Sequence, residues 1–599
     1  MVEAAAATER RPSTARLLSA ASAAFIAYTA LTFALFANVW TSPTSRWIGV
    51  DGDPDSTIWS IEWTAYALIH HVDPFVTNYI FYPSGTNILW ANADAPIALA
   101  WAATPITLAF GPIVAYNLLQ TLALSLSAWA GFLAIRRYVT LAPAALIGGL
   151  VYGFGPYAMA QAYGHMALTL GVVPPMLLIL IDRLVVRRDL SPLLAGELAG
   201  LLVAFQLLVS EELVVTEAIV AVLGLGVLAL LALIWRWQVS WRDMARRLAV
   251  AGVAAAAVFA ILAAYPVYLL FAGPARITHE PIRAFGTYVT DVFNLVIPPD
   301  AIHLIHNAWT ADLSKAFPGS PVESGGYLGI GLVAIIVFTT LRWWRIPLVV
   351  FSAAMLAAIL LISLGPALTH EGHQSTHILL PWRLARNMPL LNEILVERMT
   401  LYVDLFAGLL LAFFIEASWR SRVRFARPAA AISTAASLAL LFPSVPWVSS
   451  TAHVPTIFQP GTDANRYFQS VVPQGSVAVV LPSGDIKAGT GYAVLWQAVD
   501  GMKFRMPEGD LVHGDSNGVA TNDPLPSPLW TAISQLQSGT PPASSPADFD
   551  EVRAQLKAFG VRAVVVGPMD NQQLAVEYFS RLLDQTPTQT GGVYVWPTG

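Results

Sequence analysis

Three carboxylates stand within five residues of one another just after the first long apolar stretch of this chain, at Asp51, Asp53 and Asp55. Carboxylates this close cannot all ionise without cost. Either a cation binds among them, or the pKa of one rises toward a value that suits a general base. Pro54 restricts the turn between Asp53 and Asp55. A hydrated acidic loop with local aspartate turns is the alternative, and the residues alone leave both open.

Polar groups also interrupt the apolar sequence further along the chain. Tyr163-Gly164-His165 falls between two apolar segments, where the histidine can bind a phosphate or a metal, or can belong to a water-facing turn. Glu211 and Glu212 begin another apolar segment. They can line a cavity, or they can simply interact with the positive end of a helix dipole.

Arginine binds phosphate groups in a bidentate manner, and Arg383 and Arg398 lie in a segment that we expect on the outer side of a membrane. The alternative for both is a side chain that reaches toward lipid headgroups. The histidine-rich stretch 370–377 lacks the spacing of a helical zinc site and is interpreted as a polar loop, as are His303 and His306.

The composition places these residues in a membrane protein. Of the 599 residues 56% are hydrophobic and 12% are charged, and the mean hydropathy is +0.58. A soluble domain has about 25% charged residues. The net charge of -5 excludes the basic surface that nucleic acid requires. Cysteine is absent, which excludes disulfides and cysteine-ligated metals.

The apolar segments predict a polytopic α-helical membrane protein with about eleven transmembrane helices. Residues 1–16 form the cytoplasmic N-terminus, and residues 17–447 form the multi-span domain with its first outer loop at 40–111. Arginines gather at alternate junctions, which sets this orientation. The short apolar segment 94–110 is interpreted as an interfacial or re-entrant helix. The predicted spans are 17–39, 112–135, 141–157, 167–186, 191–209, 213–235, 248–271, 325–341, 346–364, 398–416 and 428–447.

Residues 448–599 change in character and predict a C-terminal extracytoplasmic α/β domain. Asp485, Lys487 and Trp496 in this domain can contact a glycan. The expected strands are 477–481, 563–566 and 593–595, and the expected helices are 551–559 and 571–584.

The pattern Gly52-Asp53-Pro54-Asp55, followed by Trp59 and Trp63, resembles the first outer loop of the C-type integral-membrane glycosyltransferase superfamily. We expect these two tryptophans on an amphipathic helix in the membrane interface. The stretches 73–87 and 111–119 extend the resemblance, which covers residues 40–215 and more weakly 378–416. The sequence is most similar to a bacterial, actinobacterial-type branch labelled YfhO-like.

This resemblance implies an enzyme that transfers a sugar from a polyprenyl-phosphate-linked donor to a cell-envelope glycan, lipid or protein. The reaction would take place on the outer face of the cytoplasmic membrane. A catalytic aspartate of the first outer loop would act as base on the acceptor hydroxyl, which matches Asp53 or Asp55, with Asp51 ranked third. A divalent cation, Mg²⁺ or Mn²⁺, held by Asp53 and Asp55 is left undecided. The predicted substrate-binding residues are His165, Glu211, Glu212, Arg398 and Arg383.

Two alternatives stay open. A lipid or polysaccharide transporter or flippase predicts ionisable residues buried within the spans, for which Glu217 and Asp404 are the candidates. A non-catalytic scaffold for envelope assembly predicts that Asp53 and Asp55 can both be replaced by asparagine.

Overall fold

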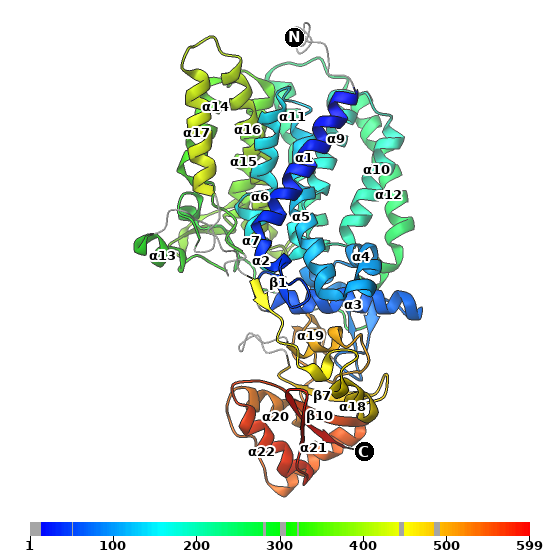
Figure 1. Ribbon diagram of the computed structural model, residues 1–599. Helices are drawn as coiled ribbons and strands as arrows, with labels where there is room; N and C mark the ends of the chain where they lie inside the picture. The colour runs from blue at the N-terminus through cyan, green and yellow to red at the C-terminus, as the bar shows by residue number, and fades with distance from the viewer. Residues whose placement is uncertain are drawn as a thin grey trace.

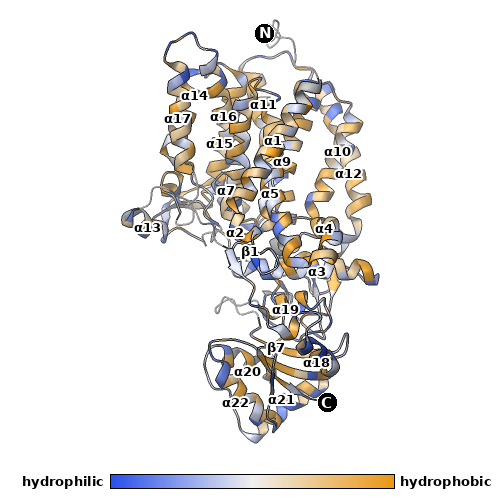
Figure 2. Cartoon of the chain, viewed as in Figure 1, coloured by the Kyte–Doolittle hydropathy of each residue, from blue (hydrophilic) through white to orange (hydrophobic). Residues whose placement is uncertain are grey.

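Long apolar helices form a bundle that makes up most of the computed structural model (Figure 1). The structure describes residues 14–50, 52–278, 283–299, 307–319, 323–441, 449–483 and 492–598. Apolar residues dominate these helices between their ends, and hydrophilic residues gather at the ends (Figure 2), as expected where helices face lipid. The bundle helices are α1 (Thr14–Leu35), α5 (Pro112–Ile135), α6 (Ala142–Phe154), α9 (Val173–Ile181), α10 (Pro192–Leu207), α11 (Glu211–Ile234), α12 (Trp241–Ala272), α14 (Gly329–Arg342), α15 (Pro347–Ser363), α16 (Thr400–Trp419) and α17 (Ala426–Leu441).

Six helical segments in the described part of the chain are long and apolar enough to cross a membrane, by length and composition. Five shorter apolar helices of 10–17 residues are α10, α14, α15, α17 and α4 (Ile97–Phe110). The chain is therefore a multi-pass membrane protein, and the total of about eleven spans stays a prediction. The six long segments are Leu18–Leu35, Pro112–Ile135, Met166–Val186, Glu211–Ile234, Trp241–Ala272 and Val396–Trp419.

Arginine-rich junctions meet at one end of the bundle. Arg137 and Arg187 both donate to Asp182, at 3.0 and 2.8 Å, and Arg420 donates to Thr140 at 2.5 Å. Figure 1 places these junctions at the end of the bundle away from α3 (Asp53–His70), which carries the acidic sequence. The acidic loop and the arginines thus lie at opposite ends, the arrangement on which the predicted orientation rests.

Helices α6 and α16 cross with their backbones in contact. Gly148 and Gly408 face each other at the crossing, and a Cβ on either one would overlap the backbone of the other helix. Small residues permit such close packing of membrane helices. The crossing fixes two helices whose ends lead directly into the polar segments around His165 and Arg398.

The first outer loop is folded rather than extended. Its strand β1 (Arg46–Ile48) pairs with β6 (Ser449–Thr451), so the loop is joined to the start of the C-terminal region. We expected Trp59 and Trp63 in the membrane interface, and this is wrong. Both are fully buried, because α3 packs against α19 (Tyr492–Val499) and Trp59 donates to Gln497 at 2.5 Å. The other elements of the loop are α2 (Ala37–Trp40), β2 (Val76–Thr77), β3 (Thr86–Asn87) and η1 (Ile88–Asp94).

Short elements connect the bundle helices. Strands β4 (Ala367–His370) and β5 (His373–Leu379) form an antiparallel hairpin in which His370 lies opposite His373. A hairpin does not give the one-sided helical spacing of a zinc motif. His303 and His306 lie outside the described residues. The remaining connecting elements are α7 (Pro156–Gln161), α8 (Met166–Thr169), η2 (Asp182–Val186), η3 (Val292–Leu295), α13 (Ala308–Ser314), η5 (Pro381–Asn387) and η6 (Val396–Met399).

The C-terminal region contains a four-stranded sheet in the order β11-β12-β10-β7. Strands β7 (Val477–Leu481) and β10 (Val561–Val566) are parallel and lie in the expected positions. Strand β7 is apolar along its length, and so is β10 apart from the exposed Arg562, because both faces of the sheet are covered. The other strands are β8 (His513–Gly514), β9 (Ala520–Thr521), β11 (Thr588–Thr590) and β12 (Val593–Pro597).

Alternate residues of the sheet pack against different partners. One face packs against α20 (Pro528–Gln537), α21 (Pro546–Ala558) and α22 (Gln572–Leu583). The opposite face shares a hydrophobic core with the α18 helix (Asp463–Val471), α19, η7 (Thr456–Phe458) and the first outer loop. Trp496 lies in this second core, stacked on Phe458, so its indole belongs to the packing of the domain rather than to a glycan contact. Asp485 and Lys487 lie outside the described residues.

The α6–α16 crossing predicts a difference between two glycine variants. Gly408→Ala places a methyl group against the carbonyl oxygen of Gly148 and should lower the free energy of unfolding by about 1–3 kcal/mol. Gly252→Ala is the matched control, because no atom lies within 4 Å of the added methyl on α12. That variant should be unchanged or stabilised by up to about 1 kcal/mol. Thermal unfolding in detergent checks both, and equal shifts would contradict the close crossing.

Candidate active site

Asp53 and His165 form a hydrogen-bonded pair at the end of the bundle opposite the arginines. Asp53 is the first residue of α3, and its Oδ2 lies 2.9 Å from His165 Nε2. The Asp53 side chain is 52% exposed and that of His165 only 11%. A half-exposed carboxylate is therefore hydrogen-bonded to a nearly buried imidazole.

The backbone ahead of α3 determines this placement. Val50 donates its N–H to the carbonyl of Tyr163 at 2.9 Å, which joins the outer loop to the turn that contains His165. Gly49 has a φ of +118°, and a Cβ there would overlap the same carbonyl group. Asn117 on α5 also accepts from the N–H of Ile48 at 3.1 Å. The loop can approach the turn this closely only with glycine at position 49.

Two side chains contact the other ring nitrogen of His165. Nδ1 lies 2.8 Å from Gln161 Oε1 and 3.6 Å from Glu323 Oε1. Gln161 donates its amide to Glu323 Oε2 at 3.4 Å, which turns the amide oxygen toward the ring. Both ring nitrogens thus face oxygen acceptors, and each can donate only while it carries a proton.

A buried arginine lies behind this layer. Arg398 in η6 donates from Nε to both carboxylate oxygens of Glu323, at 3.1 and 3.2 Å, and from Nη2 to Oε1 at 2.5 Å. Its Nη1 donates to Glu212, whose second oxygen accepts the N–H of Leu395 at 3.0 Å. We call the connected set the Asp53–Arg398 network. It consists of Asp53, His165, Gln161, Glu323, Arg398 and Glu212.

The charges of the network determine the protonation of Asp53. Loss of hydration raises the pKa of Asp53. The hydrogen bond and charge of His165, together with the charges of Arg398 and Arg283, lower the pKa and outweigh this effect. The net result is a pKa below the ordinary value. For Glu323, burial raises the pKa, and the Arg398 charge together with its hydrogen bonds outweighs that effect and lowers it. Both carboxyls are therefore ionised near neutral pH.

The other predicted site residues are placed differently. Asp55 is completely buried in the first turn of α3, whereas Asp51 lies outside the described residues. Glu211 is half-buried at the start of α11, and Arg383 is exposed on η5. The structure thus brings Asp53, His165, Glu212 and Arg398 together and leaves Asp55 and Arg383 apart from them.

Glu323 and Gln161 are members of the network that the sequence analysis missed. Gln161 stands four residues before His165, a spacing that brings the two side chains together on one helical turn. Glu323 precedes an apolar segment in a predicted outer loop, the same context that drew attention to Glu211 and Glu212. The same context could have drawn attention to Glu323. Its pairing with Arg398 could not be predicted, because the two residues are 75 positions apart in the sequence.

A divalent cation at Asp53 and Asp55 stays a prediction, and Asp51 of the same acidic sequence lies outside the described residues. Among the described residues no group of three or more histidine and acidic side chains has the geometry to hold a metal ion. Asp53 is paired with His165, and Asp55 is buried within α3. We therefore derive no chemical step through a metal.

Known proteins resemble this chain in fold but not in sequence. No protein family and no curated protein matches it. The solved structure of the arabinofuranosyltransferase AftD from Mycobacteria matches 98% of this chain and 40% of that chain, with a TM-score of 0.55 and 17% identity. This chain thus spans about two fifths of the AftD length.

Two other solved structures are more distant in fold. The oligosaccharyltransferase of Archaeoglobus fulgidus matches 94% of this chain and 71% of that chain, with a TM-score of 0.45 and 12% identity. ArnT from Cupriavidus metallidurans matches 95% of this chain and 97% of that chain, with a TM-score of 0.44 and 12% identity. The similarity to AftD shows that this chain shares its fold with that arabinofuranosyltransferase.

The buried position of Arg398 predicts a large loss of stability on its removal. Arg398→Met leaves the carboxylates of Glu323 and Glu212 buried without their cation, which should cost about 3–5 kcal/mol of unfolding free energy. Arg383→Met is the control, and at an exposed position its effect should stay within about 0.5 kcal/mol. Unfolding of both variants in detergent checks this, and a small loss for Arg398→Met would mean that the buried pair is not formed.

The Asp53–His165 pair predicts a pH effect. A carboxylate acts as a base only when it is ionised, so a reaction with Asp53 as its base would be lost as the pH falls through the pKa of Asp53 in the folded protein. His165→Ala removes a hydrogen bond and a charge that lower this pKa. If Asp53 is the base of a transfer reaction, the acidic limb of the kcat/KM profile should therefore move to higher pH. His373→Ala on the exposed hairpin is the control and should leave the acidic limb in place. An unmoved acidic limb in His165→Ala would mean that His165 does not set the pKa of Asp53.

Proposed function

We propose that this chain is a membrane glycosyltransferase that uses a polyprenyl-phosphate-linked sugar donor. Its acceptor is a hydroxyl group of a cell-envelope glycan, lipid or protein on the outer face of the cytoplasmic membrane. The observation that carries the proposal is the half-exposed Asp53 carboxylate held by His165 in front of a buried, charge-paired network. The fold shared with the arabinofuranosyltransferase AftD supports it. The assignment to the YfhO-like branch is part of the proposal and rests on sequence resemblance.

In the proposed reaction the acceptor oxygen forms a bond to the anomeric carbon of the donor sugar. The bond from that carbon to the phosphate oxygen breaks, and its electron pair leaves with the polyprenyl phosphate. The hydroxyl proton passes to Asp53, which is ionised because its pKa is low. A positioned base of this kind contributes about 10²–10⁴-fold to a rate.

The remaining network residues hold Asp53 in position. His165 holds one oxygen of the carboxylate, and Gln161 and Glu323 hold His165. We predicted that Arg398 binds the donor phosphate, but its N–H groups donate to Glu323 and Glu212 instead. We now assign it to positioning, and the exposed Arg383 stays the candidate for the phosphate.

The polyprenyl chain of the donor needs an apolar surface. A cavity of about 360 Å³ lies between α4, α10 and α12 and is lined by the aromatic residues Phe75, Trp101 and Tyr265. Its remaining lining residues are almost all apolar. We assign this cavity to the lipid part of the donor, because an isoprenoid gains free energy by leaving water for such a surface.

A transporter is the second candidate, because Glu217 and Asp404 are buried in α11 and α16 as it predicts. Asp404 has a structural explanation, since it accepts the N–H of Tyr157 at 3.3 Å where α7 begins. The carboxylate oxygens of Glu217 have no hydrogen-bond partner among the described residues. The transfer assay described next separates the two candidates, because a transporter moves its substrate without forming a glycosidic bond.

The proposed base predicts the outcome of a transfer assay. Purified protein in lipid is given a panel of polyprenyl-phosphate sugars and a cell-envelope extract. Asp53→Asn should reduce transfer by about 10²-fold or more with the fold intact. Asp312→Asn, an exposed position on α13, is the control and should transfer like the wild type. Equal rates in both variants would remove Asp53 from the chemistry, and no product from the wild type with any donor would contradict the proposed function.

A further inference from the structure

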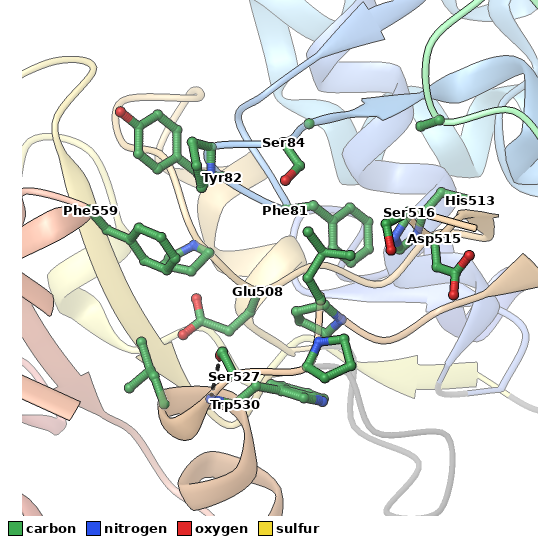
Figure 3. Close-up of a pocket in the computed structure, with 18 of the residues that line it drawn as sticks. Phe81, Tyr82, Ser84, Glu508, His513, Asp515, Ser516, Ser527, Trp530 and Phe559 are labelled. Atoms are coloured by element: carbon green, nitrogen blue, oxygen red, sulfur yellow. Dashed lines mark hydrogen bonds between the residues drawn. The ribbon is translucent and has the colours of Figure 1, made fainter. Parts of the chain in front are cut away.

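A second cleft lies between the first outer loop and the C-terminal region. It has a volume of about 420 Å³ (Figure 3). None of its lining residues belongs to the Asp53–Arg398 network. Its principal side chains are Phe81, Tyr82, Glu508, His513, Trp530 and Phe559.

Backbone hydrogen bonds hold the walls of this cleft in place. Phe81 donates its N–H to Glu508 at 3.0 Å, and Tyr82 donates to Met506 at 2.9 Å. Met506 donates in turn to Tyr79 at 2.8 Å. At Gly509 a Cβ would lie 2.5 Å from the Phe81 ring, so only glycine fits there. The outer loop and the C-terminal region therefore form one continuous wall.

Glu508 is the unusual residue of the cleft. It is 1% exposed, and neither of its carboxylate oxygens has a hydrogen-bond partner among the described residues. Burial raises the pKa of Glu508 to about 8, although the N–H groups of Glu508 and Val480 lie near enough to oppose this in part. Figure 3 shows its side chain pointing into the cleft between Phe559 and Ser527. An unsatisfied buried carboxyl costs about 1–3 kcal/mol, a cost that a hydroxyl-bearing ligand would remove.

Aromatic side chains surround this group. Tyr82, Trp530 and Phe559 are each half-buried, so part of each ring faces the cleft. Asp515 is occupied within its own turn, where it accepts from Asn517 and Val519 at 2.7 and 2.9 Å. Flat apolar surfaces beside a carboxyl group that lacks a hydrogen-bond partner among the described residues match a sugar, which has a face of C–H groups and an edge of hydroxyls.

The cleft is connected to the helix that carries the proposed base. Ser56 donates its hydroxyl to the carbonyl of Asp510 at 2.6 Å. Ser56 stands three residues after Asp53 on α3, and Asp510 stands two residues after Glu508. A ligand held at Glu508 would therefore rest on a segment that contacts the first turn of α3.

We propose that the cleft binds a saccharide unit of the acceptor, distinct from the unit that carries the reacting hydroxyl. Glu508 forms hydrogen bonds to the sugar hydroxyls, and Trp530 packs against the ring. The proposal rests on the proposed function, because it assigns a glycan as the acceptor.

Titration with defined oligosaccharides tests this inference. An arabinofuranosyl hexasaccharide, mannohexaose and maltohexaose are added to the full-length protein in detergent, and binding is measured by calorimetry. At least one should bind. Trp530→Ala should weaken its binding on the order of tenfold, the size expected for loss of an aromatic contact. Trp309→Ala is the matched control, because Trp309 is an exposed tryptophan outside the cleft.

A substitution at Glu508 separates binding from folding. Glu508→Met keeps the length of the side chain and removes its hydrogen-bonding atoms. It should weaken binding on the order of tenfold while the melting temperature stays the same or rises, because a buried unsatisfied group has been removed. Glu508→Gln restores hydrogen bonding and should recover part of the affinity. No binding by the wild type, or unchanged affinity in Trp530→Ala and Glu508→Met, would overturn the proposal.

Failure of the cleft and failure of the proposed function give different results. Asp53→Asn should lose transfer but bind the oligosaccharide like the wild type. Transfer by the wild type with an acceptor KM that Trp530→Ala does not change would refute the cleft alone. Oligosaccharide binding that depends on Trp530, without transfer from any donor, would refute the transferase and leave the cleft standing.

Discussion

The guanidinium of Arg398 lies between the carboxylates of Glu323 and Glu212, and the candidate site depends on this arrangement. A buried cation is tolerated only when its charge and its N–H groups are matched, so the three side chains hold one another in place. They come from η6 directly before α16, from the segment ahead of α14 and from the start of α11. The pairing therefore gathers three helix ends behind His165. Asp53 then meets His165 from a fourth element, so its position is set by helices that are distant in the sequence.

Close helix packing makes this assembly possible. The contact of Gly148 with Gly408 brings α6 against α16 without intervening side chains. Asp404 on α16 then accepts the N–H of Tyr157, where α7 begins, and α7 ends at Gln161 beside His165. The contact between Asp404 and Tyr157, and the placement of Gln161 next to His165, thus depend on the close crossing of α6 and α16 at small residues. The buried carboxylate of Asp404 has a structural role here, which weakens the case for transport that its burial alone would make.

The C-terminal sheet extends the protein beyond the membrane-like bundle. One of its faces shares a core with the first outer loop, and Gln497 accepts the indole N–H of Trp59. The same association forms the cleft around Glu508 and joins it to α3 through Ser56. A base and a glycan cleft on one continuous surface would suit an enzyme that acts on a long acceptor, since binding energy far from the reacting atoms can then position the hydroxyl.

The sequence by itself determined the membrane class, most of the helices and the apolar strands β7 and β10. It also marked Asp53, His165 and Arg398 as candidate site residues. These follow from local signals, because hydrophobic runs and isolated charges in apolar surroundings are visible in short windows. Only the tertiary structure decided that Asp53 is exposed whereas Asp55 is buried, that Arg398 is paired with carboxylates, and that Trp59, Trp63 and Trp496 are buried. Glu323 joined the site in the same way. The physical reason is that burial and charge pairing depend on which helices meet, and Glu212, Glu323 and Arg398 become neighbours only when segments separated by 75 and 186 residues pack together.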